Sequence, residues 1–216
     1  MEDIPKKNTE KNHMTSPTEY FERSLEDFFR PLLSVRLPND RLYNRSHMWV
    51  QDDSASTATI GVDHIGAYFL QPIVSVVLPQ TPSRIEYRSP CTWLVLREGT
   101  IALRSAIAGM ATESNNNLLE RPYLLLDDPY NLGWILRVKK SEIKQQRTEL
   151  YTAEEYTPIF LNEVNGVRGK FAAAFKKAQP NVGSTLFDGG EPIRSIQEIL
   201  GQKRYFEIAC KLFSKL

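Results

Sequence analysis

The stretch from Arg41 to Lys139 most constrains the fold, because short β-prone runs alternate there with turn residues. Strands this short, repeated about every 8–12 residues, are typical of a small barrel or sandwich. Turns are expected at Gln80–Ser83 and Glu113–Asn117, and Asp63 is suited to cap one helical turn that ends near Leu70. The predicted strands are Met48–Gln51, Ser56–Gly61, Ile73–Leu78, Thr92–Arg97, Thr100–Leu103, Ala106–Met110 and Gly133–Val138.

Helical patterns flank this stretch on both sides. Glu19–Leu33 repeats apolar residues at helical spacing, Thr18 is suited to cap it, and Pro31 predicts an end nearby. Thr152–Ala178 has the same periodicity, with Phe160, Val164, Val167, Phe171 and Phe175 on one face. Pro180–Glu191 is expected to be a loop, and a last helical segment, Ile193–Leu216, is expected to break at Gly201.

The sequence therefore predicts an α+β chain, mainly β with flanking helices. We expect a disordered arm over residues 1–17, a helix and turn over 18–40, a barrel over 41–140 and a helical extension over 141–216. The arm is polar and charged and has no apolar segment of the kind a secretory signal needs.

Composition excludes several functions. A formal net charge of +1 gives no long-range field that would attract nucleic acid or an anionic membrane. No stretch approaches the roughly 20 apolar residues of a membrane-spanning helix. The two cysteines, Cys91 and Cys210, lie far apart and have no metal-binding spacing. A reduced, cytoplasmic protein is the expectation.

Three motifs, in order, carry a family resemblance. His47–Val50 (HMWV) followed by Ala58–His64 (ATIGVDH) resembles the H-x-W-V and T-x-G-I-T-D-x-A of the glycine cleavage H-protein. Pro72–Pro79 (PIVSVVLP) is similar to that family's G-D-I-V-x-V-x-L-P strand, and Asp128–Ile135 (DPYNLGWI) is similar to its D-P-Y-x-x-G-W-[LI]. The resemblance spans about half of the chain and implies a lipoyl-type barrel-sandwich fold.

In that family a barrel hairpin presents a lysine that carries lipoate as an amide. Aligning Ser105–Gly109 on the family's S-P-V-S-G places Glu98 at the lysine position, with Arg97 and Gly99 beside it. Lipoylation needs an amine that can lose its proton and attack an acyl group, which neither glutamate nor arginine offers. No lysine occurs between Lys11 and Lys139, so another alignment register does not restore the site. We expect no lipoate or biotin here, and no other cofactor.

The resemblance then implies a non-enzymatic protein that binds other proteins as a scaffold or regulator. Its partners would be enzymes that recognise lipoyl-type domains, or a second copy of the chain. An apolar stripe in the extension, including Ile208 and Leu212, either covers the barrel or binds a partner. The alternative is a carrier in a glycine-cleavage-like or sulfur-handling system modified at another residue, for which Cys91 is the candidate. The expected docking surface comprises Arg97, Glu98, Gly99, Phe206 and Phe213.

The sequence contains no motif that supports a catalytic or metal site. A zinc site from His47, His64 and Cys91 lacks the usual ligand spacing. A triad of Ser105, His64 and Asp63 lacks the G-x-S-x-G turn. The glycine-rich segment 183–190 lacks the Lys-Ser/Thr of a phosphate-binding loop. No catalytic residue and no metal ligand is therefore predicted.

Overall fold

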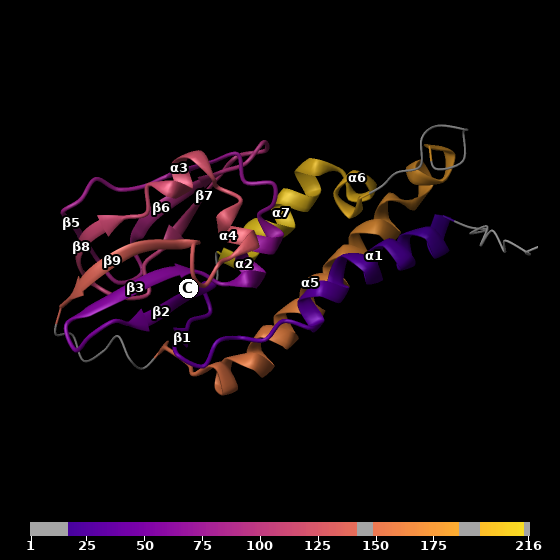
Figure 1. Cartoon of the computed structure of the whole chain (residues 1–216). Helices are drawn as coiled ribbons and strands as arrows, with labels where there is room; N and C mark the ends of the chain where they lie inside the picture. The colour runs from indigo at the N-terminus through magenta and orange to yellow at the C-terminus, as the bar shows by residue number, and fades with distance from the viewer. Residues whose placement is uncertain (1–16, 142–148, 186–194, 214–216) are drawn as a thin grey trace, which may run out of the picture.

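The protein consists of a β sandwich at one end and a pair of long helices that project from it (Figure 1). The computed structural model describes residues 17–141, 149–185 and 195–213. The arm expected over residues 1–17 lies outside the described residues except for Pro17, which begins the first helix. None of the described helices is long and apolar enough to cross a membrane.

Two antiparallel sheets form the sandwich. The larger has the strand order β1-β2-β3-β9-β8-β5 and the smaller the order β4-β6-β7. The predicted α+β class is confirmed. The strands of the larger sheet are β1 (Leu42–Tyr43), β2 (Met48–Asp52), β3 (Thr57–Val62), β5 (Ser83–Ile85), β8 (Gly109–Ser114) and β9 (Trp134–Lys140). Those of the smaller sheet are β4 (Ser75–Val77), β6 (Pro90–Val95) and β7 (Thr100–Arg104).

Trp49 fixes the pairing of the first two long strands. It lies opposite Gly61 in the β2–β3 ladder, where a Cβ on Gly61 would lie 2.5 Å from the indole ring. The buried indole N–H donates to the Pro129 carbonyl at 3.1 Å, and the Arg41 guanidinium stacks over the ring at 4.7 Å. Two of the motifs recognised in the sequence thus meet around one side chain. The expected cap is confirmed, because the Asp63 carboxylate accepts the Gly66 N–H at 2.8 Å and begins α2 (His64–Phe69).

Several sequence predictions for the β region need correction. The strand predicted at Ala106–Met110 is wrong at its start, because β8 begins at Gly109. The Ser105 hydroxyl donates to the Ile107 carbonyl at 2.6 Å and holds this segment in a local turn instead. The turn predicted at Gln80–Ser83 gives way at Ser83 to β5. The turn predicted at Glu113–Asn117 overlaps the end of β8, which pairs with β9 as far as Ser114. Two helices of one turn each, α3 (Asn117–Glu120) and α4 (Leu124–Asp127), are too short to show a period in sequence.

The predicted helices on either side are confirmed. The first ends at Leu33 as predicted but begins at Pro17, so Thr18 lies inside the helix and is not its cap, and the second is longer than predicted. α1 (Pro17–Leu33) contains Pro31, and α5 (Ala153–Thr185) continues through Pro180. The loop predicted at Pro180–Glu191 is therefore wrong as far as Thr185, since proline weakens a helix without forbidding it. The rest of that loop lies outside the described residues. α1 and α5 lie side by side (Figure 1), with Phe21 stacked on Phe175 at 3.9 Å between ring centroids.

The last helical segment divides where predicted. α6 (Ile196–Leu200) and α7 (Gln202–Phe213) meet at Gly201, whose φ of 82° favours glycine. The Ser195 hydroxyl accepts the Glu198 N–H at 3.2 Å and caps α6. In Figure 1, α7 lies between the sandwich and the long helices, so it bridges the two parts of the molecule.

Candidate functional site

The β6–β7 hairpin ends in a tight turn formed by Leu96–Gly99. The Leu96 N–H donates to the Gly99 carbonyl at 2.8 Å, directly beyond the last strand pair, Val95 and Thr100. Leu96 is buried, whereas Arg97 and Glu98 are exposed. This turn, the hairpin tip, therefore presents a guanidinium and a carboxylate to solvent, and a backbone hydrogen bond within the turn holds its shape.

Helix α7 lies against this tip. A Cβ on Gly99 would lie 2.8 Å from the end of the Phe206 ring, so the Phe206 side chain packs closely on the turn. Phe206 is half-buried. Four residues of the expected docking surface, Arg97, Glu98, Gly99 and Phe206, thus lie on or beside the turn.

Phe213 lies elsewhere. It is buried, its ring meets the His47 imidazole edge-on at 5.4 Å, and it would touch a Cβ on Gly66 at 3.1 Å. Ile208 and Leu212, from the same apolar stripe, are also buried. The apolar face of α7 is therefore occupied within the chain, and Phe206 is its exposed margin.

A buried polar cluster holds the start of α5 against the sandwich. Tyr156 donates its hydroxyl to the Asp63 carboxylate at 2.8 Å, and His47 Nδ1 lies 3.2 Å from the same oxygen. On the other side of the imidazole, His47 Nε2 lies 3.5 Å from the Glu163 carboxylate. Burial, with the nearby Asp63 charge, raises the pKa of Tyr156 well above its usual value. Tyr156 and Glu163 were not singled out from the sequence, because no local spacing relates them to His47 and Asp63.

The catalytic and metal arrangements considered from the sequence are not assembled. Asp63 is engaged by His47 and Tyr156, while His64 packs beside Tyr68. The Ser105 hydroxyl is directed to the backbone. Cys91 is buried, with its thiol 3.5 Å from the Leu103 carbonyl. Among the described residues, no three histidine, cysteine or acidic side chains converge on a position that could hold a metal ion.

Comparison with known proteins places the sandwich in a defined family. The model of the glycine cleavage H-protein family matches residues 41–163. A probable glycine cleavage system H protein 1 from Saccharolobus solfataricus is 30% identical over 54% of this chain and 85% of its own length. The glycine cleavage system H protein of Rubrobacter xylanophilus is 32% identical over 56% of this chain and 93% of its own.

A solved structure shows the same fold. The crystal structure of a glycine cleavage system H protein from Mycobacterium marinum superposes with a TM-score of 0.50 at 24% identity. It covers 56% of this chain and 97% of its own. The lipoyl-type barrel-sandwich predicted from the sequence motifs is confirmed. The family match ends at residue 163, inside α5, so α1, α6 and α7 lie outside it.

Proposed function

Because the chain belongs to the glycine cleavage H-protein family, we propose that it uses the family's hairpin as a protein-binding surface and carries no lipoate there. The observation that carries the proposal is the chemistry of the turn. Arg97 and Glu98 are its exposed side chains, and neither can form an amide with lipoate. The nearest lysines in the sequence are Lys11 and Lys139.

The surroundings of the turn support a binding role. A carrier arm needs free space around its attachment point, whereas here Phe206 of α7 packs against Gly99. A partner that approaches the tip would meet Arg97, Glu98 and the exposed edge of Phe206 together. Aromatic side chains and arginine are both enriched at protein interfaces.

The protein then acts as a scaffold or regulator of enzymes that recognise lipoyl-type domains, and catalyses no reaction itself. A carrier modified at Cys91 is disfavoured, because burial raises the pKa of that thiol to about 12. The proposal keeps the protein in the cytoplasm, on the basis of its two widely separated, unpaired cysteines.

Lipoylation tests the chemistry directly. The wild-type protein, Glu98→Lys and Arg97→Lys are each incubated with lipoate, ATP and a lipoate ligase, and their intact masses are measured. We expect no adduct on the wild type, an adduct on Glu98→Lys and none on Arg97→Lys, because only position 98 aligns with the carrier lysine. The unmodified form of an H-protein that has the carrier lysine serves as the positive control.

A wild-type adduct of lipoyl mass would refute the proposal. If Arg97→Lys were lipoylated in preference to Glu98→Lys, position 97 rather than position 98 would correspond to the carrier lysine of the family.

Partner binding is tested with surface variants that leave the fold intact. Captured proteins are compared between the wild type, Arg97→Ala/Glu98→Ala and the control Arg84→Ala/Glu86→Ala, which removes an exposed ion pair on and beside β5. We expect the tip variant alone to lose an enzyme that also binds lipoyl-type domains. Equal capture by all three proteins would contradict a docking role for the tip.

A further inference from the structure

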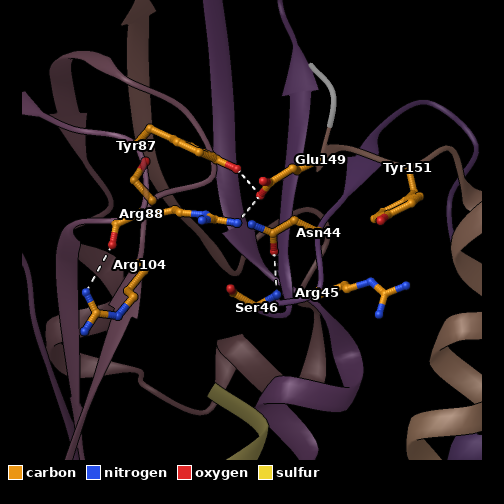
Figure 2. Close-up of a pocket in the computed structure, with 9 residues that line it drawn as sticks. Asn44, Arg45, Ser46, Tyr87, Arg88, Arg104, Glu149 and Tyr151 are labelled. Carbon is orange, nitrogen blue, oxygen red and sulfur yellow. Dashed lines mark hydrogen bonds and ion pairs between the residues drawn. The ribbon is translucent and has the colours of Figure 1, made fainter. Parts of the chain in front are cut away.

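A cavity of about 370 Å³ lies at the opposite end of the β6–β7 hairpin from the turn. Four segments distant in sequence line it: residues 44–46 before β2, 87–88 before β6, 104–105 at the end of β7 and 149–151 before α5 (Figure 2). Its volume falls within the range of about 300–1,000 Å³ that is usual for small-molecule sites. The fold therefore builds this cavity from both sheets and the segment that leads into α5.

The lining of the cavity is basic. Arg45, Arg88 and Arg104 contribute three guanidinium groups, against the single carboxylate of Glu149. Arg45 and Arg88 are exposed and Arg104 is half-buried, so a ligand from solvent can reach all three. In a chain with a formal net charge of +1, this is a local concentration of positive charge.

The carboxylate of Glu149 already occupies part of the cavity and indicates that the cavity binds anionic groups. The Tyr87 hydroxyl donates to its carboxylate, and Arg88 Nη2 lies 2.6 Å from the same oxygen (Figure 2). The hydrogen bond from Tyr87, together with the Arg88 guanidinium, holds the pKa of Glu149 below its usual value. A phenol and a guanidinium thus already bind one anionic oxygen supplied by the chain itself.

Further donors line the same cavity. Arg104 donates to the Arg88 carbonyl at 3.1 Å, which uses one of the five N–H groups of a guanidinium. The Ser46 side chain also lines the cavity, as do the rings of Tyr87 and Tyr151. A ligand with a single carboxylate would only repeat the contacts of Glu149. A phosphoryl group has three terminal oxygens and suits several guanidinium groups at once.

We propose that this cavity binds a phosphate monoester of a small organic molecule, and that Glu149 is the internal anion which the phosphate displaces from Arg88. The organic part of the ligand contacts the tyrosine rings. The site is independent of the hairpin tip and of whether the protein is lipoylated.

Calorimetric titration at constant ionic strength tests this, with phenyl phosphate as the probe and benzoate as the carboxylate analogue. Glu149→Gln removes the competing charge and is expected to bind phenyl phosphate about tenfold more tightly. Arg88→Gln is expected to bind about tenfold more weakly, the loss that one charge-assisted hydrogen bond represents. The control Arg84→Gln removes an exposed arginine outside the cavity and should change affinity less than about twofold.

Thermal unfolding checks that each variant is folded. If Arg88→Gln does not fold, Arg104→Gln is used in its place, and the same loss of affinity is expected. Backbone amide shifts on titration should be confined to residues 44–46, 87–88, 104–105 and 149–151, the segments that line the cavity. Absence of saturable binding to both the wild type and Glu149→Gln would overturn the proposal. An equal loss in Arg84→Gln would show that binding is only nonspecific, and benzoate binding as tight as phenyl phosphate would exclude a phosphate site.

Discussion

The two cysteines differ in burial, and this difference decides which thiol can react. Cys91 is only 3% exposed, between the sheets, and burial raises its pKa to about 12. Cys210 lies half-buried on α7, where burial also raises the pKa of its thiol. At pH 8 a thiol of pKa 12 is ionised in roughly one molecule in 10,000, and the thiolate is the reactive form.

We predict that a disulfide reagent at pH 8 titrates one thiol per native chain, that of Cys210, and two after denaturation. Cys210→Ser should abolish the native reaction, and Cys91→Ser should leave it unchanged. Two thiols of equal rate in the native protein would contradict the burial of Cys91 and would favour the carrier alternative.

Single residues also show the limit of prediction from sequence. Asp63 was recognised as a helix cap from its position alone, because capping is local. Its other partner, Tyr156, was not found, since the two are 93 residues apart and meet only in three dimensions. Glu149 was missed for the same reason, because its bonds to Tyr87 and Arg88 span about 60 residues of chain.

Two glycines in the helical part of the chain occupy different backbone conformations. Gly201 joins α6 to α7 at a φ of 82°, whereas Gly166 lies inside α5. A Cβ at either position would meet nothing within 4 Å, so the two sites differ in backbone conformation rather than in space.

Gly201→Ala is therefore expected to lower the free energy of unfolding by about 1–3 kcal/mol, because alanine is strained at this positive φ. Gly166→Ala should raise it by about 0.5–1 kcal/mol, because alanine is the better helix former. Urea denaturation of both variants beside the wild type measures the difference. Equal stability of the two variants would show that the junction at Gly201 relaxes without cost.

Elements were predictable where their pattern is local and regular. The long strands β2, β3 and β9 follow from β-prone runs between turn residues, and the helices α1 and α5 follow from helical periodicity. The start of β8 was misplaced, because the Ser105 side chain competes with the ladder for backbone partners. A hairpin at Glu98 was implied by the family resemblance, although the strand predicted at Thr92–Arg97 runs two residues past the end of β6. The contact of this hairpin with α7 was not predicted, since sequence does not show which helix packs against which turn.

In the whole molecule, the sandwich and the helices share one core. Tyr156 of α5 stacks on Tyr43 of β1 at 5.2 Å, and Tyr205 of α7 donates its hydroxyl to the Phe69 carbonyl at 3.1 Å. Phe213 covers His47. We therefore expect the boundary predicted at Lys140 to separate stretches of sequence rather than independently folding units.

We predict that a chain ending at Lys140 does not unfold cooperatively on heating and binds a hydrophobic dye, because it leaves Tyr43 and His47 uncovered. A chain ending at Thr185 keeps Tyr156 and should show a cooperative transition at a lower temperature than the full chain. A truncated sandwich as stable as the full chain would show that the helices are accessory.

The position of Phe213 on His47 also affects how the protein is made. His47 precedes the first long strand, so the early part of the sandwich leaves the ribosome with one of its surfaces uncovered. Synthesis must continue through the next 73 residues after β9, from Ser141 to Phe213, before α7 can cover that surface. At about 5–20 residues per second this takes roughly 4–15 s, long enough for a chaperone to bind the nascent chain.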